Sequence, residues 1–274
     1  MLKKLVYPTS KRWKVYSAPD VKSRGCDKVS PLTAPIREIF SSIQGEGIFV
    51  GCRQIFLRFA GCNLTCSYCD TPRDIPEQCY WEKRPGTRKF FTSPNPMTAQ
   101  DVALILRELE PAAHHSISLT GGEPLLHTHF LRELIPLIKG TRQGIYLETN
   151  GTLPAFLKPL LPFIDIIAMD IKLPGTAKVK PLWDEHREFL ELACTKNTFV
   201  KIIVDENSKM EEIEKALDLI CDVGDFPVVF QPVTTPDAKI KLSAEKIITW
   251  QSLAMKRLTD VRVVPQTHKF LGYL

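Results

Sequence analysis

The chain has 274 residues, of which 44% are hydrophobic and 24% charged, and this composition excludes whole-chain disorder. The net charge of +5 is unevenly placed, because residues 1–30 hold eight Lys or Arg and only two Asp or Glu. We therefore expect a basic N-terminal arm over residues 1–34, followed by one domain over residues 35–274. The arm is interpreted either as a solvated extension or as a contact for an acidic partner or nucleic acid, and a large basic face on the core is not indicated.

No run of 18 apolar residues occurs, which argues against a membrane-spanning helix. The opening segment, MLKKLVYPTSKRWK, has no apolar stretch after its basic start and does not resemble a secretory signal. We therefore expect a cytoplasmic protein without membrane partners. In that compartment, eight cysteines indicate metal binding rather than disulfides.

Short, nearly continuous apolar segments predict strands at residues 55–60, 116–120, 145–150, 165–172, 198–205, 226–233 and 261–265. Helical patterns lie between them at residues 98–109, 128–139, 183–193, 208–220 and 243–257. Thr98 and Ser208 each precede an acidic residue by three positions and predict capping boxes. Pro136 predicts a kink or an early end in the second helix.

This alternation of strands and helices predicts an α/β fold with a parallel sheet and helices outside it. Right-handed crossovers give either an open doubly wound sheet or a barrel. The strand count favours a partial (β/α) barrel of about six parallel strands. Residues 72–97, rich in Pro, Arg, Lys and aromatics, fall outside the pattern and predict a long loop insertion.

Three cysteines with C-x3-C-x2-C spacing, Cys62, Cys66 and Cys69, follow the first of these strands. A structural zinc ion normally has four ligands. Three thiolates on a [4Fe–4S] cluster instead leave one iron free to bind a substrate or cofactor. The spacing favours such a cluster, and the alternative is a zinc site with a distant fourth ligand such as Cys79 or His127.

A second motif, Gly121-Gly122-Glu123-Pro124, ends the next predicted strand. Glycines there allow the backbone to approach a ligand closely. Backbone carbonyls and a carboxylate are suitable partners for an ammonium group. Because both motifs follow strands, we expect them at the carboxyl ends of a parallel sheet.

The segment CNLTCSYCD, with GGEP one strand later, resembles the radical S-adenosylmethionine (SAM) superfamily. The resemblance implies that the three cysteines hold a [4Fe–4S] cluster whose open iron binds the amino and carboxylate groups of SAM. One electron, from an external donor such as flavodoxin or ferredoxin, then cleaves SAM to methionine and a 5′-deoxyadenosyl radical. The residues expected at SAM are Tyr68, Cys69, Asp70, Gly122, Glu123, Asp170, Ile171, Lys172 and Gln231. Relatives often have Ser-Pro-Lys at positions 170–172, where this chain departs.

Five flanking blocks are more specific than the cluster motif: SIQGEG at 42–47, Arg58, CDT at 69–71, ETNGT at 148–152 and QTHK at 266–269. Together they resemble the 7-carboxy-7-deazaguanine synthases over about residues 36–270. The resemblance implies a radical SAM lyase that contracts 6-carboxy-5,6,7,8-tetrahydropterin to 7-carboxy-7-deazaguanine, in queuosine-type deazapurine biosynthesis.

By position, this resemblance assigns the pterin to Ile43, Gln44, Gly45, Arg58, Thr120 and Pro265, and a magnesium ion to Thr71. A guanidinium such as that of Arg58 can bind a carboxylate through two parallel hydrogen bonds. An internal ion pair with Glu38, Glu46 or Asp70 is the alternative for Arg58. The hydroxyl of Thr71 is equally suited to cap a helix.

Two other functions are kept open. A radical SAM activase would generate a glycyl radical on a partner protein, and Met169-Asp170-Ile171-Lys172 together with the mixed segment 72–97 is compatible with one. A zinc-binding module without catalysis is the other, although GGEP argues against it. A homodimer is the assembly we consider for the synthase.

Overall fold

The computed structural model describes residues 32–235 and 237–274, and residues 32–274 form one compact unit. Residues 1–31 of the predicted basic arm lie outside the described residues. Its last two residues form the short strand β1 (Thr33–Ala34), which pairs with β6 (Met97–Thr98). None of the described helices combines the length and the apolar character that crossing a bilayer requires.

Seven parallel strands form the centre of a ten-stranded sheet, in the order β12-β11-β10-β9-β8-β7-β3. They are β3 (Arg53–Phe59), β7 (Ile117–Gly121), β8 (Ile145–Thr149), β9 (Ile166–Ile171), β10 (Asn197–Val204), β11 (Val228–Pro232) and β12 (Val261–Val263). In a doubly wound sheet the strand order reverses at a switch point. Here the order follows the chain without reversal, so the predicted α/β fold with its mostly parallel, barrel-like sheet is confirmed.

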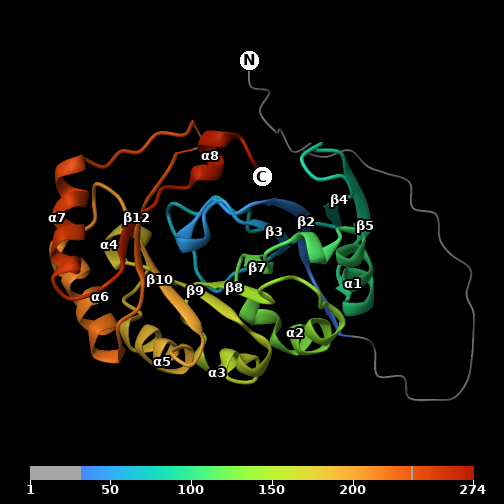
Figure 1. Cartoon of the computed structure of the whole chain (residues 1–274), viewed down its shortest axis with the longest axis horizontal. Coiled ribbons are helices and arrows are strands. Elements are labelled where there is room, and N and C mark those ends of the chain that lie inside the picture. The colour runs from blue at the N-terminus through green and yellow to red at the C-terminus, as the bar shows by residue number, and fades with distance from the viewer. Residues whose placement is uncertain (1–31, 236) are drawn as a thin grey trace, which may run out of the picture. The chain divides into compact units, whose positions relative to one another are not determined.

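The main helices lie along the outer side of these strands (Figure 1). They are α1 (Ala99–Glu108), α2 (Thr128–Leu134), α3 (Pro154–Leu157), α5 (Trp183–Ala193), α6 (Met210–Val223) and α7 (Ala244–Met255). Two further short helices, α4 (Pro174–Ala177) and α8 (Thr267–Leu271), follow β9 and β12. Neighbouring parallel strands are consecutive in the chain, and the connections between them have the same right-handed sense. The connecting helices therefore gather on one face of the sheet. The opposite face is left free to form a site.

The predicted helix starts were right in one case and wrong in the other. Thr98 caps α1 by accepting a hydrogen bond from the backbone N–H of Asp101 at 3.2 Å. The predicted capping box at Ser208 is wrong, because its hydroxyl instead accepts from the backbone N–H of Asp205 at 2.9 Å. Pro136 has the expected effect: α2 ends at Leu134, and the chain continues as the 3-10 helix Ile135–Leu137.

The prediction of a loop over residues 72–97 is wrong, because this segment contains two antiparallel strands, β4 (Gln78–Glu82) and β5 (Phe90–Pro94). They extend the sheet beyond β2 (Ile36–Ile43), a strand that the apolar pattern also missed. β2 is antiparallel to β3 and parallel to β4. Because β2 mixes apolar and polar side chains in the sequence IREIFSSI, it lacks the continuous apolar run used to find the others.

Side chains of the parallel strands alternate between two environments. Along β9, Ile167, Met169 and Ile171 pack outward in the main core against the helices. Ile166 and Ala168 point to the inner face, where a smaller apolar cluster also contains Tyr146 and Phe199. Phe49, from the 3-10 helix Gly47–Phe49 between β2 and β3, packs against this inner cluster. Apolar residues thus fill the inner face along the first part of these strands, and polar side chains follow toward the carboxyl ends.

Candidate active site

A polar layer lies above the inner apolar cluster, toward the carboxyl ends of the strands. Each of six parallel strands contributes one inward polar side chain: Arg58, Thr120, Glu148, Asp170, Lys201 and Gln231. The pairing register places Arg58 beside Thr120 and Lys201 beside Asp170. All six line one cavity, which the cysteine loop also borders.

The cysteine loop follows β3 and brings Cys62, Cys66 and Cys69 to the cavity wall. All three are free thiols, and burial raises the pKa of Cys62 and Cys66. Ser67, between them, is fixed to α4, because its backbone N–H donates to the carbonyl of Ala177 at 2.9 Å. Three thiols at the rim of a polar cavity fit a cluster that keeps one iron open to a ligand.

The two fourth ligands considered for a zinc site have other partners. Cys79 is fully buried in the main core on β4, and burial raises the pKa of its thiol to about 12. The ring of His127 stacks on Phe59, and its Nε2 lies 3.3 Å from the carbonyl oxygen of Ala60. Within the described part of the chain, no three His, Cys, Asp or Glu side chains are grouped for a single ion. Neither Cys79 nor His127 lines the cavity that the three cysteines border, so neither is placed as a fourth zinc ligand.

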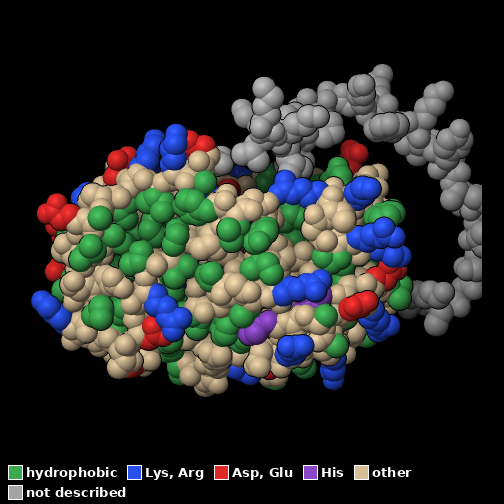
Figure 2. All heavy atoms as spheres, turned by 45° about the horizontal axis from the view of Figure 1, so that its top comes forward, with side chains coloured by type: hydrophobic (Ala, Val, Ile, Leu, Met, Phe, Trp, Pro, Cys, Tyr) green, Lys and Arg blue, Asp and Glu red, His purple; other side chains and the backbone are tan. Residues whose placement is uncertain are grey.

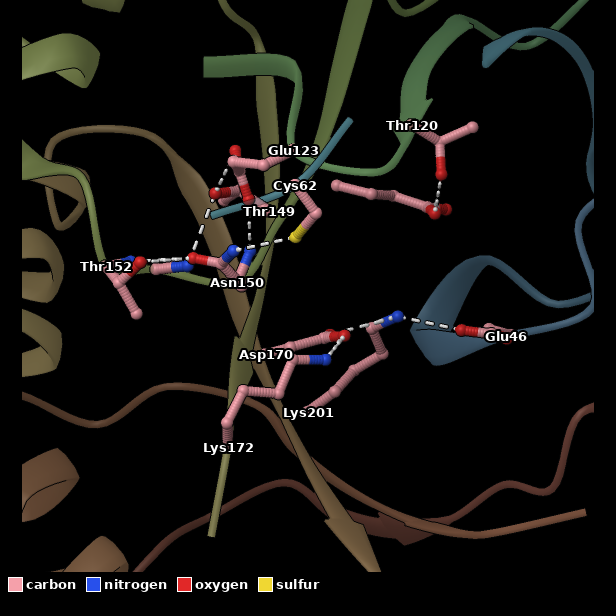
Figure 3. Close-up of polar contacts among 12 residues, drawn as sticks. Glu46, Cys62, Thr120, Glu123, Thr149, Asn150, Thr152, Asp170, Lys172 and Lys201 are labelled. Atoms are coloured by element: carbon pink, nitrogen blue, oxygen red, sulfur yellow. Dashed lines mark hydrogen bonds and ion pairs between the residues drawn. The ribbon is translucent and has the colours of Figure 1, made fainter. Parts of the chain in front are cut away.

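The GGEP loop contributes backbone and structural contacts to this site. A side chain on Gly122 could not be accommodated, since its Cβ would lie 1.7 Å from the carbonyl oxygen of Gly61. Glu123 was expected at the SAM ammonium, but its carboxylate is fully buried and accepts from the backbone N–H groups of Leu125 at 3.1 Å and Asn150 at 2.8 Å. Burial raises its pKa to about 7. Glu123 does not line the cavity and instead joins the ends of β7 and β8 (Figure 3).

Three side chains expected at SAM line the cavity and have buried polar atoms without a hydrogen-bond partner: the Tyr68 hydroxyl, Asp170 Oδ1 and Gln231 Oε1. Asp170 Oδ1 is nevertheless 3.0 Å from the Lys201 ammonium. Buried polar atoms are normally paired, so the other two indicate a polar ligand in this cavity. Lys172 lies 5.7 Å from the Tyr68 ring centroid. The side chain of Ile171 points outward into the main core, away from this cavity.

A buried ionic network crosses the cavity wall (Figure 3). The Lys201 ammonium, on a residue only 2% exposed, lies 2.8 Å from Glu46 and 3.0 Å from Asp170. Asp170 also pairs with Lys172 at 2.8 Å. Burial disfavours the charged forms, but the opposite charges outweigh it, so the pKa of Glu46 lies well below its usual value and that of Lys201 well above. Both groups are therefore ionised near neutral pH.

Arg58 and Glu148 also line the cavity. Arg58 Nε donates to Glu38 at 2.6 Å, which is the internal pair considered above, yet Arg58 still lines the cavity. Burial lowers the pKa of Arg58, but Glu38 and other carboxylates outweigh this effect and raise it overall. Glu148 accepts from the Thr120 hydroxyl at 2.6 Å and from the Gln44 amide at 2.8 Å. Both contacts fix the orientation of its carboxylate.

Four residues assigned to the pterin do not line this cavity: Ile43, Gln44, Gly45 and Pro265. The side-chain amide of Gln44 is fully engaged by Gln54, Glu148 and the backbone of Glu46. Gly45 allows the C-terminal segment to approach, since a Cβ there would lie 2.3 Å from His268 Nδ1. The assignment of these four residues to the pterin therefore stays a prediction.

Thr71 and Asp70 lie at the cavity edge beside the cysteine loop. No helix begins after Thr71, so the interpretation of its hydroxyl as a helix cap is wrong. Asp70 pairs with Lys269 of α8 at 2.9 Å. The C-terminal segment is thereby tied to the cysteine loop.

The cavity residues that were not assigned to the site from the sequence include Glu46, Glu148, Asn150, Lys201 and Gln266. All of these except Lys201 belong to the blocks SIQGEG, ETNGT and QTHK, but none of them had been given a role. Lys201 had a different signal, because it is the only charged residue in the strand sequence NTFVKIIV. A charged residue within a strand buried on both faces predicts an ionic or functional partner.

Comparisons with known proteins agree with this geometry. Residues 57–224 match the radical SAM superfamily. The 7-carboxy-7-deazaguanine synthase of Geobacter sulfurreducens is 44% identical over 246 residues, covering 88% of this chain and 98% of the relative. The enzyme of the same name from Methanothermobacter thermautotrophicus is 34% identical over 261 residues, again covering 88% and 98%.

Among solved structures, the crystal structure of QueE from Escherichia coli aligns with a TM-score of 0.51 at 20% identity, covering 85% of this chain and 93% of that chain. This likeness concerns the fold. The sequence matches, which span nearly the full length of the relatives, establish the family. The chain belongs to the radical SAM superfamily and, within it, to the family of the 7-carboxy-7-deazaguanine synthases.

Proposed function

We propose that this enzyme converts 6-carboxy-5,6,7,8-tetrahydropterin to 7-carboxy-7-deazaguanine. The observation that carries the proposal is one cavity bordered both by three free thiols and by the side chains of Arg58 and Glu148. With a [4Fe–4S] cluster and SAM bound, the thiol side would supply a radical able to abstract hydrogen. The remaining side chains bind and orient a small polar substrate.

Arg58 is positioned to bind the substrate carboxylate. Its Nε atom is held by Glu38, which leaves the two terminal nitrogens of the guanidinium for a second anion. Glu148 offers the substrate a carboxylate whose position is fixed by Thr120 and Gln44. A fixed carboxylate can hydrogen-bond the N–H groups of a pterin ring, and it can hold a proton during a rearrangement.

The cavity favours a small molecule over the activase alternative. Phe49 and the inner apolar cluster fill the barrel below the polar layer. Gln266, directly before α8, donates to Glu46 at 2.8 Å, and Lys269 pairs with Asp70. A glycyl-radical loop of a partner protein would have to displace these contacts to reach the cysteines.

Further partners belong to the same proposal. Thr71 is the residue proposed for magnesium, with substrate oxygens and water as its other ligands. An external one-electron donor such as flavodoxin or ferredoxin, a cytoplasmic location and a homodimer are also proposed.

On the face shown in Figure 2, Lys and Arg side chains are interspersed with acidic and apolar ones, which does not favour nucleic-acid binding. The division into an arm over 1–34 and a domain from 35 remains part of this proposal.

The decisive experiment is anaerobic turnover. Reconstituted enzyme with SAM, reductant and magnesium should convert 6-carboxy-5,6,7,8-tetrahydropterin to 7-carboxy-7-deazaguanine, detected by mass spectrometry. Omitting magnesium tests the proposal for Thr71 separately. If the enzyme cleaves SAM but leaves the pterin unchanged, the proposed substrate is wrong.

A further inference from the structure

We propose that Asn150 sets the reduction potential of the cluster by donating a hydrogen bond to the Sγ atom of Cys62. The inference rests on Cys62 being a cluster ligand, as the proposed function requires. Asn150 directly follows β8 and is 6% exposed. Its Nδ2 atom lies 3.8 Å from the Cys62 Sγ atom, at the wall of the cavity (Figure 3).

The orientation of the Asn150 amide follows from its partners. Its Oδ1 atom lies 3.1 Å from the backbone nitrogen of Thr152 and 2.6 Å from the Thr152 hydroxyl. A backbone N–H can only donate, so the Asn150 atom facing it must be the oxygen. The NH2 group is therefore the part of the amide that faces Cys62.

The two hydrogens of this NH2 group have two acceptors. One acceptor is Asn63 Oδ1 at 2.9 Å, and the other is the Cys62 sulfur. A protonated Cys62 directs its thiol toward Asn63 Oδ1 at 3.9 Å. As a thiolate ligand it has no hydrogen to donate, and it then accepts from Asn150 and from the backbone N–H of Leu64 at 3.4 Å.

The backbone of Asn150 is also held on both sides. Its N–H donates to Glu123 at 2.8 Å, and its carbonyl lies 3.1 Å from Nε2 of the buried His186. Asn150 thus has a fixed position before any cofactor binds. Within residues 32–235 and 237–274, no side-chain N–H reaches the sulfur of Cys66 or Cys69, so the donor acts on one ligand of the three.

A hydrogen bond to a coordinating sulfur withdraws negative charge from the cluster. The reduced cluster carries one more electron than the oxidised cluster, so the donor stabilises it more and raises the reduction potential. Asn150 therefore makes the cluster easier to reduce. It acts through Cys62 and is a positioning residue rather than a catalytic one.

The test is an anaerobic potentiometric titration of the reconstituted enzyme, followed by electron paramagnetic resonance. Asn150→Leu is close in size and neutral, and it should lower the ratio of reduced to oxidised cluster at a fixed potential by about tenfold, which is 59 mV for one electron. Thr152→Val removes one of the two contacts that orient the amide and should shift the ratio in the same direction by less. Gln54→Leu removes a buried amide outside the cavity and should leave the ratio unchanged.

An unchanged ratio in Asn150→Leu with full iron content would overturn the inference. If Asn150→Leu fails to hold four irons, the inference is tested with Thr152→Val instead. An unchanged ratio of reduced to oxidised cluster in Thr152→Val would then overturn the inference. A shift of equal size in Gln54→Leu would show that lost stability, not the hydrogen bond, moves the potential. The titration uses no pterin, so a failure of the proposed substrate is seen separately in the turnover assay.

Discussion

Lys201 is the residue whose environment tolerates change least. Its ammonium is the cation between Glu46 and Asp170 inside the protein. Lys201→Met should leave Glu46 buried without an opposite charge and lower the free energy of unfolding by about 3–5 kcal/mol. Urea denaturation measures the change. Lys239→Met, which removes the exposed pair with Asp237, should have almost no effect, and an equal loss in both variants would argue against the network.

The same network predicts a pH dependence with a definite sign. Burial raises the pKa of Glu46, but Lys201 and its other partners lower it more, to well below its usual value of 4.5. A lowered pKa in the folded state means that the stabilisation is present above pH 4.5 and is lost as the pH falls below it. The difference in unfolding free energy between the unmodified protein and Glu46→Gln should therefore shrink below pH 4.5, by up to about 1.4 kcal/mol per pH unit. A constant difference from pH 6 to pH 3 would contradict this.

The proposed substrate predicts a specific role for the Arg58 side chain. Arg58→Lys keeps the positive charge but cannot pair with Glu38 and also present two nitrogens to a carboxylate. We expect KM for the pterin to rise about tenfold, while iron content and substrate-free SAM cleavage stay near normal. Arg53→Lys, on the same strand but outside the cavity, is the control. Loss of the cluster in Arg58→Lys, with an unchanged KM in the remaining enzyme, would make Arg58 structural.

At the level of elements, the contact between the GGEP loop and the cysteine loop sets the position of the cluster. Gly122 lies against the Gly61 carbonyl with no space for a Cβ, although its own backbone is not in the left-handed region. Gly122→Ala should therefore displace the cysteine loop and sharply lower the iron content after reconstitution. Gly140→Ala is a suitable comparison, since Gly140 has a φ of +110° but a Cβ there would make only an ordinary contact, 3.9 Å from Pro111. It should cost stability without loss of iron, and equal iron loss in both would refute the contact argument.

At the scale of the whole molecule, ligands should stabilise the fold because the site joins six strands. SAM at 100 times its Kd contributes about 2.7 kcal/mol to the folded state. For a chain of this size we expect a rise in Tm of about 5–10 °C in the reconstituted enzyme. Calorimetry under anaerobic conditions measures it. Cys66→Ala, which should not hold the cluster, should show no such rise, and an equal rise would place SAM elsewhere.

The sequence by itself determined the class of the fold and the location of the chemistry. Continuous apolar strands separated by amphipathic helices specify a parallel sheet, because both of its faces are covered. The spacing of Cys62, Cys66 and Cys69 is a local property, readable without any long-range contact. The flanking blocks identified the family by resemblance, and the near full-length relatives confirmed it.

Only the tertiary structure decided which polar residues face the cavity. The alternation along each strand fixes two faces, but which face is inward depends on register and on the neighbouring strands. Thus Glu123 and Gln44, expected at ligands, became internal supports, whereas Glu148, Lys201 and Asn150 came to the wall. Their partners lie far away in the chain, as Glu46 does from Lys201, so no local pattern could have paired them.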